Sequence, residues 1–163
     1  MTIGESLRSA WNFVSGQGAQ LSLELDTRAL RAGDELGVRV VVQSTGVEVF
    51  SRGVKLDLVG EETLDPGAFQ VLDFANPQRT RPHDLLVGGS TTTLNAHFRL
   101  CEAFRLEPSR SVPLRARVRV PANARPTYAG VNAQHVYKVR ARLDVTGTDP
   151  TSEWLPLTVA ARV

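Results

Sequence analysis

The sequence predicts an all-β protein, a two-sheet antiparallel β-sandwich with one short helix at its N-terminus. Three observations predict it. Apolar and polar residues alternate in many short runs from Leu21 onward, turn-forming residues separate these runs, and helical spacing of apolar residues occurs only before Gly18. We therefore divide the chain into an N-terminal amphipathic helix and linker, residues 1–18, and one sandwich domain, residues 19–163.

The first segment has the features of a helix. Thr2 and Glu5 form a capping-box pattern, and Gly16 and Gly18 end the segment. The residues that share its apolar face are Ile3, Leu7, Ala10, Trp11 and Val14. So short a helix must dock on something. It packs either on its own sandwich or on a partner or second copy, for which Leu7, Trp11 and Val14 are the candidate contacts. Contact of Trp11 and Phe13 with a membrane is not expected, because Arg8 is the only cation in the segment.

The first half of the sandwich shows alternation of period two. Residues 21–25, 36–42 and 54–58 each place apolar side chains at every second position, as half-buried strands do. Val47 and Val49 begin a short strand before Arg52-Gly53. Turns are expected at residues 32–34 and 44–46, where glycine stands beside polar residues.

The second half begins with the stretch that is hardest to interpret, residues 64–93. There we expect a strand near 69–74, a loop over 76–84 and a turn at Gly88-Gly89-Ser90. Further strands are predicted at 91–100, 114–120, 136–145 and 155–159. Pro156 places the last of these at a sheet edge, because proline cannot donate a ladder hydrogen bond.

Composition favours a cytoplasmic protein. Cys101 is the only cysteine, the N-terminus has no signal-peptide pattern, and no apolar run reaches the ~20 residues of a membrane span. Lysine occurs only at Lys55 and Lys138 among 19 basic residues, which hints at a GC-rich bacterial genome. Residues 1–81 carry 8 basic and 11 acidic side chains, whereas residues 82–163 carry 11 and 6. The basic clusters lack interleaved aromatics, so nucleic acid is not an expected partner.

No pattern indicates an enzyme, a cofactor or a metal site. His97 and Cys101 would lie about 13 Å apart along a strand, too far to share a metal. We expect instead a buried cysteine and ordinary surface histidines. The chain has no Gly-x-Ser-x-Gly elbow and no phosphate-binding glycine loop. No catalytic residue is therefore assigned.

Two rows of basic residues are the most informative polar feature. The outward positions of two predicted strands carry Arg115, Arg117 and Arg119, and Lys138, Arg140 and Arg142. If these strands lie close in one sheet, they form a six-cation surface that attracts an acidic or phosphorylated partner. Alternatively, acids such as Glu107, Asp144 and Glu153 neutralise an ordinary solvated face.

Several short motifs, in this order, resemble the arrestin-like superfamily. They are an opening hairpin with a glycine–acid turn (residues 23–42), a strand ending in glycine and glutamate (54–61), a segment leading into a long strand (104–114), the end of that strand (118–121), a Pro-Thr-Tyr-Ala-Gly turn (126–130) and the strand that follows (136–141). The resemblance covers residues 21–159, apart from a poor match at 64–93, and is greatest to bacterial sporulation-control proteins. Retromer's arrestin-like subunit is more distant.

The resemblance implies an immunoglobulin-like or arrestin-like sandwich that works as an adaptor or scaffold, without catalysis or cofactor. Relatives with two lobes are longer, and this chain has length for one lobe only, so their phosphate-sensing and inter-lobe residues are not carried over. Leu114, Ala116 and Ser109 depart from the family pattern. The expected partner is a protein or peptide held at strand edges or at the basic face. The alternative is a structural subunit of a larger bacterial assembly that self-associates through strand edges and the N-terminal helix, whereas a homodimer is compatible with the adaptor.

Overall fold

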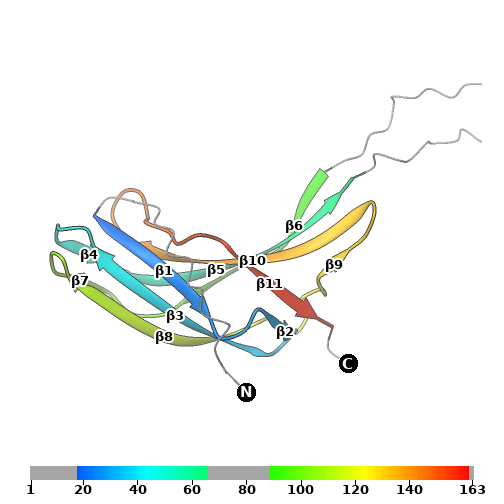
Figure 1. The fold of residues 1–163 in the computed structure, drawn as a ribbon, viewed down its shortest axis with the longest axis horizontal. Helices are drawn as coiled ribbons and strands as arrows, with labels where there is room; N and C mark the ends of the chain where they lie inside the picture. The colour runs from blue at the N-terminus through cyan, green and yellow to red at the C-terminus, as the bar shows by residue number, and fades with distance from the viewer. Residues whose placement is uncertain (1–17, 66–88, 162–163) are drawn as a thin grey trace, which may run out of the picture.

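The computed structural model describes residues 18–65 and 89–161, and this part of the chain is all-β (Figure 1). Its strands form two main sheets and one small ribbon. The smaller main sheet has the order β1-β3-β8, formed by Ala19–Leu25, Glu35–Ser44 and Ser111–Arg119. None of the described segments forms a helix that could cross a bilayer.

The larger sheet has the order β2-β11-β10-β5-β6, with β9 added to β10. Its strands are β2 (Ala29–Arg31), β5 (Gly53–Leu64), β6 (Gly89–Arg99), β9 (Tyr128–Ala129), β10 (Ala133–Asp144) and β11 (Leu155–Ala160). The ribbon pairs β4 (Val49–Ser51) with β7 (Phe104–Leu106). Every strand pair is antiparallel except β2 with β11.

The core lies between the two main sheets and follows the predicted alternation. On β3, Leu36, Val38 and Val40 are at most 4% exposed. The same faces of β5 and β10 supply further buried side chains, namely Val54, Leu56, Leu58, Val139, Ala141 and Leu143. Burying a leucine or valine side chain contributes about 1.5–3 kcal/mol, so these rows hold the sheets together. The all-β prediction is confirmed.

The sheet arrangement is more mixed than the predicted pair of antiparallel sheets. The parallel strand β2 was missed because three residues are too few to show a period. The short strand begun at Val47 and the alternation that continues past Arg52-Gly53 form two separate strands, β4 and β5, in different sheets. Where they join, Gly53 has φ 139°, and a Cβ on it would lie 2.5 Å from the Cys101 carbonyl oxygen. The chain therefore leaves the ribbon strand β4 and enters β5 through a residue that must be glycine.

The turns at 32–34 and 44–46 are confirmed, with Gly33 and Gly46 both at positive φ. The turn expected at Gly88-Gly89-Ser90 is wrong for its last two residues, which begin β6. Pro156 lies opposite Lys138 on β10, and β2 pairs β11 only from Thr158 to Ala160. Pro156 has no N–H to donate, and at this position β11 has no described neighbour other than β10. The predictions for residues 1–17 and 66–88 lie outside the described residues.

The outer ends of β5, β6 and β10 project beyond the small sheet as an arm (Figure 1). At its base the Tyr137 ring packs over Gly60, where a Cβ would lie 2.7 Å from the ring. His135 beside it is fully buried, with Nε2 2.6 Å from the Thr93 hydroxyl and Nδ1 2.9 Å from the Pro126 carbonyl. The expectation of a surface histidine is therefore wrong here, because the inward positions of β10 continue past the sandwich into the arm.

Candidate functional site: two basic rows on different sheets

The predicted six-cation surface does not form. The strand that carries Arg115, Arg117 and Arg119, the β8 arginine row, pairs with β3 in the small sheet. The strand that carries Lys138, Arg140 and Arg142, the β10 basic row, lies between β5 and β11 in the large sheet. Side chains that point outward from two stacked sheets point away from each other. The prediction failed because period two fixes which face a side chain takes but not which strand becomes its neighbour.

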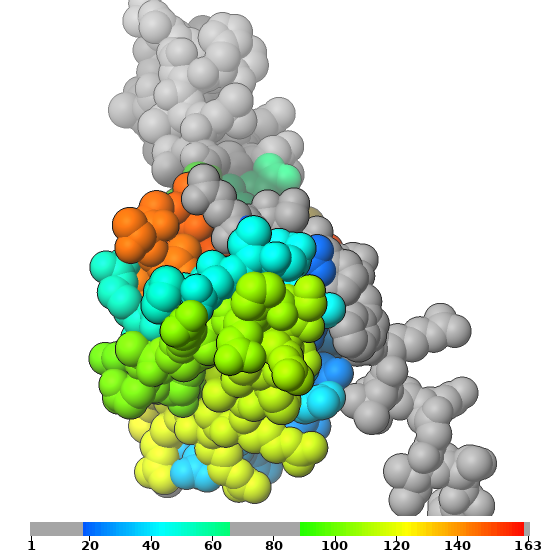
Figure 2. Space-filling model, turned by 90° about the vertical axis from the view of Figure 1, so that its left-hand side faces the viewer, coloured from blue at the N-terminus to red at the C-terminus, as the bar shows by residue number. Residues whose placement is uncertain are grey.

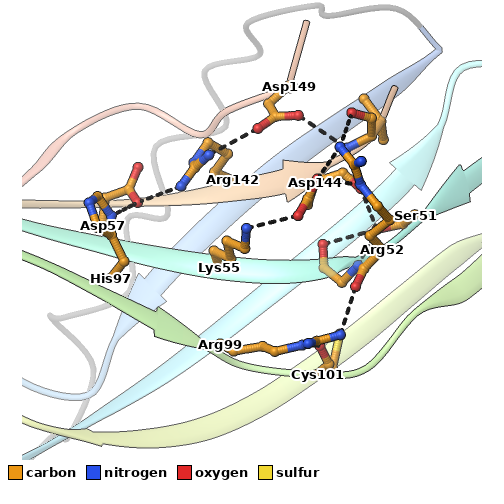
Figure 3. Close-up of polar contacts among 12 residues, drawn as sticks. Ser51, Arg52, Lys55, Asp57, His97, Arg99, Cys101, Arg142, Asp144 and Asp149 are labelled. Atoms are coloured by element: carbon orange, nitrogen blue, oxygen red, sulfur yellow. Dashed lines mark hydrogen bonds and ion pairs between the residues drawn. The ribbon is translucent and has the colours of Figure 1, made fainter. Parts of the chain in front are cut away.

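Two members of the β10 basic row, Arg140 and Arg142, hold a buried carboxylate, Asp57. Figure 3 shows Arg142 and Asp57. Asp57 on β5 is 3% exposed, although it points away from the core. Arg140 Nε donates to its Oδ2 at 3.1 Å, and an Arg142 terminal nitrogen donates to its Oδ1 at 3.2 Å. His97 Nδ1 lies 2.7 Å from the same Oδ1. Both carboxylate oxygens are therefore occupied.

The register explains why these groups meet. Asp57 is the Cα partner of Arg140 on β10 and of His97 on β6, so the three form one row across three strands. Side chains directly opposite each other in an antiparallel pair lie on the same face at about 5 Å. Alternation over 54–58 predicts the outward position of Asp57, but only the strand order reveals its cationic neighbours.

Acids also hold the rest of the β10 basic row. Arg142 binds Asp149 at 3.0 Å as well as Asp57, and Lys138 binds Glu61 at 2.9 Å. A second pair of cations beside the row, Lys55 and Arg52, is held by Asp144 at 2.8 and 2.7 Å (Figure 3). The alternative prediction, that acids neutralise the basic residues, is therefore correct for this row, although most of the acids are not the ones expected.

Trp154 adds an aromatic contact to the same face. Lys138 Nζ lies 5.0 Å and the Arg140 guanidinium 4.4 Å from its ring centroid. Cations over an indole face gain about 0.5–2 kcal/mol. The sequence analysis missed both Trp154 and Asp57. The only available signal was that Asp57 interrupts an apolar run at an outward position.

The electrostatics show how firmly this row is held. Burial raises the pKa of the Asp57 carboxyl, but hydrogen bonds from His97, Arg142 and Arg140 outweigh burial and hold that pKa below its usual value. Burial lowers the pKa of Arg142, and its hydrogen bonds with Asp57 and Asp149 more than reverse this. A hydrogen bond from Lys55 lowers the pKa of Asp144. Asp57, Arg142 and Asp144 are therefore charged at neutral pH, and each is matched to a partner.

The β8 arginine row is different. Arg117 and Arg119 are 76% and 73% exposed, and among the residues that the structure describes their one acidic neighbour, Glu35, is at 3.7 and 3.5 Å. Arg115 has no acidic partner in residues 18–65 or 89–161, and its Cα partner on β3 is another arginine, Arg39. Like charges directly opposite destabilise a sheet. In the space-filling view the yellow-green atoms of the β8 region lie at the surface (Figure 2).

A shallow groove crosses the outer face of the small sheet beside this row. Gly37 leaves a gap in its floor, and Arg39, Arg115 and Arg117 lie along it. Asp26 fills part of the gap, because its Oδ1 accepts a hydrogen bond from the Gly37 amide at 3.1 Å. A Cβ at position 37 would lie 2.3 Å from the other Asp26 oxygen. The groove therefore leads from an acidic end at β1 to a basic end at β8.

The remaining candidates give no metal centre. His97 is exposed, as predicted, although it is bound to Asp57, and Cys101 is half-buried instead of buried. No group of three or more metal-ligating side chains occurs among the residues that the structure describes. Leu7, Trp11 and Val14 of the predicted helix, and His83, lie outside the described residues.

Comparison with known proteins identifies the fold. The structure matches the crystal structure of Spo0M, a sporulation control protein from Bacillus subtilis, with a TM-score of 0.65 and 16% sequence identity. The match covers 89% of this chain and 50% of the Spo0M chain, so this chain spans about half the length of the protein it matches. No family model and no curated protein matches the sequence. The predicted resemblance to arrestin-like sporulation-control proteins is confirmed as a likeness of fold.

Proposed function

We propose that the chain is a non-catalytic interaction module, an adaptor or scaffold that binds a protein or peptide partner at the small sheet through the β8 arginine row. The observation that supports this is the contrast between the rows. The β10 basic row is matched by acids within the chain, whereas the β8 arginine row is exposed with a single weak acidic neighbour. Unmatched cations in a row attract an acidic partner. The proposal includes no cofactor and places the module in the cytoplasm.

The absence of catalysis is part of the proposal. Asp57, a buried carboxylate with a lowered pKa, accepts hydrogen bonds on both oxygens from permanently charged arginines. A general base needs an oxygen that is free to reach the substrate proton. Asp57 is therefore suited to hold the sheet together and not to move protons.

Site-specific crosslinking in the native cells tests this function. A photo-crosslinking residue at Ser111, exposed at the start of β8, should give a discrete adduct, and the same residue at Thr158, exposed on β11, should not. Reversal of one charge, Arg117→Glu, should remove the adduct. Equal adducts at both positions, or an adduct that survives the reversal, would reject the β8 arginine row as the contact.

A second candidate function is a subunit of a larger assembly. The two outer strands of the small sheet have opposite charge on their outward faces, with Glu24 on β1 and the arginines on β8. Such edges could join head to tail, and heterologous contacts of this kind form rings or filaments. Glu24 is already 3.2 Å from Arg39, which makes this the weaker proposal. Light scattering discriminates, because the adaptor predicts a monomer or dimer and the assembly a much larger species.

A further inference from the structure

We infer that the free edge of β8 binds an extended segment of a partner in which acidic residues alternate with small or apolar residues. The inference rests on the proposed function and names its ligand. It goes further than charge alone, because it states which backbone groups of β8 pair with the segment and which side chains of the segment face each arginine.

The hydrogen bonds at the two ends of β8 fix which residues point to the free edge. Ser44 N donates to Arg110 O at 2.9 Å, and Val120 N donates to Asp34 O at 3.0 Å. The register between these ends is uninterrupted, and an antiparallel pair exchanges hydrogen bonds at every second residue. Even-numbered residues of β8 therefore bond to β3, and odd-numbered residues direct N–H and C=O away from it.

The outward-pointing residues are those of the β8 arginine row. No described strand pairs with β8 on the side away from β3, and no acceptor for the amides of Arg115, Arg117 and Arg119 occurs within the described chain. The same three residues thus offer both a free amide at the edge and a cationic side chain on the outer face. An extended peptide adds to such an edge through its own backbone groups.

Pro113 supports this assignment from the sequence side. It is an odd-numbered residue of β8, so its lack of an N–H affects only the free edge and removes no hydrogen bond between β8 and β3. Proline also limits an added strand, since no donor exists at that position. Continuous pairing is expected from Arg115 to Arg119.

The two faces of β8 define the side chains of the ligand. A residue of the added strand that lies beside an arginine shares the outer face with it, at cross-strand distance. The next residue lies on the inner face beside Leu114 or Ala116, which are only half-buried although their β3 partners Val40 and Val38 are buried. A small or apolar residue there would cover the exposed sides of these two core residues. Acid and apolar residues must therefore alternate.

Charged residues on edge strands also protect a protein from unwanted pairing. The arginines perform this role against neutral or basic strands, whose addition would leave three cations close together without partners. An acidic strand would place carboxylates beside the arginines, and it would therefore also reduce the repulsion between Arg39 and Arg115. Protection against wrong strands and selection of an acidic strand are therefore the same property.

The probe for a binding test is a short, capped, dye-labelled peptide in which glutamate alternates with threonine. Fluorescence anisotropy with the full chain should show binding that weakens as salt is raised. A peptide of the same composition with its glutamates grouped together, and one with lysine in place of glutamate, should bind at least about fivefold more weakly, because each cross-strand charge pair contributes up to a factor of this size.

Two substitutions at one position separate charge from backbone pairing. Arg117→Ala removes the cation and keeps the edge amide, and it should weaken binding about fivefold. Arg117→Pro also removes the amide, which does not bond to β3, and should weaken binding by about a further fivefold. Arg28→Ala is the matched control, since it removes an exposed cation in the loop before β2 and should change nothing. Circular dichroism checks that each variant is folded.

The outcomes are distinct. Equal affinity for the alternating and grouped peptides, or equal affinity of the Arg117→Ala and Arg117→Pro variants, overturns the strand-addition inference. If crosslinks at Ser111 persist in that case, the proposed function stands with another ligand. If light scattering instead shows self-association that Arg117→Pro abolishes, the occupant of the edge is a second copy, and the inference is wrong.

Discussion

The two basic rows have the same sequence pattern and opposite surroundings. In both, cations occupy every second position of a strand, with apolar residues between them. The β10 basic row lies in the middle of a sheet, where its neighbours β5 and β11 bring Asp57, Glu61 and Trp154 against it. The β8 arginine row lies at an edge, with β3 as its one neighbour. The interior row is therefore matched within the described chain, and the edge row is left mostly exposed to solvent.

This difference separates stability from binding. Substitutions in the interior row should lower the stability of the sandwich, because they leave charged groups unpaired at positions that solvent hardly reaches. Substitutions in the edge row should leave stability nearly unchanged and alter binding.

The largest effect is expected for Asp57→Ala. Removing a carboxylate that is 3% exposed leaves Arg140 and Arg142 side by side without their common partner, which should lower the free energy of unfolding by about 3 kcal/mol. Urea unfolding followed by tryptophan fluorescence measures it. Asp57→Asn keeps the volume and should lose less. A loss below about 1 kcal/mol for Asp57→Ala would mean that the cluster is not structurally important.

Arg140→Glu should have the next largest effect. The new carboxylate would lie beside Asp57 Oδ2, which is 3.1 Å from Arg140 Nε in the wild type. The substitution would also remove the contact between Arg140 and Trp154. Because Arg140 is 32% exposed, solvent and a change of rotamer reduce the cost to about 2 kcal/mol. Arg140→Gln removes the charge without reversing it and should fall between this variant and the wild type.

Acid should reduce the same stabilisation. The pKa of Asp57 is lowered in the folded state, so its contribution is fully present above its usual value of 3.8 and is lost as the pH falls through the lower, folded value. The difference in melting temperature between the wild type and Asp57→Asn should therefore shrink as the pH falls below 3.8. A difference that disappears at neutral pH would contradict the assignment.

Trp154→Ala should cost about 1 kcal/mol, because it removes the ring that lies over Lys138 and Arg140. Trp154→Phe keeps a weaker aromatic face and should recover part of the loss. The control for the exposed ring itself is the double variant with Arg140→Gln, in which the effect of Trp154→Ala should be smaller.

Particular residues show how far the sequence could predict this molecule. The alternation of Leu36, Val38 and Val40 was sufficient for strand β3 and its buried face, because one face of a sheet must be apolar. The outward direction of all six cations could also be predicted. Their partners could not, because Arg140 meets Asp57, 83 residues earlier, only through the order of the strands. Short strands such as β2 and β9 contain too few residues to show a period.

The smallest effect on stability is expected for Arg117→Glu. Arg117 is 76% exposed and lies 3.7 Å from Glu35, so its reversal trades one weak attraction for one weak repulsion. The free energy of unfolding should change by no more than about 0.5 kcal/mol. Its amide points to the free edge, so the ladder between β3 and β8 stays complete. Urea unfolding beside Arg140→Glu gives the direct comparison, since the two variants make the same change of charge on the two rows. A loss for Arg117→Glu that equals the loss for Arg140→Glu would show that the edge row is structural, and the β8 arginine row would then no longer be available for a partner.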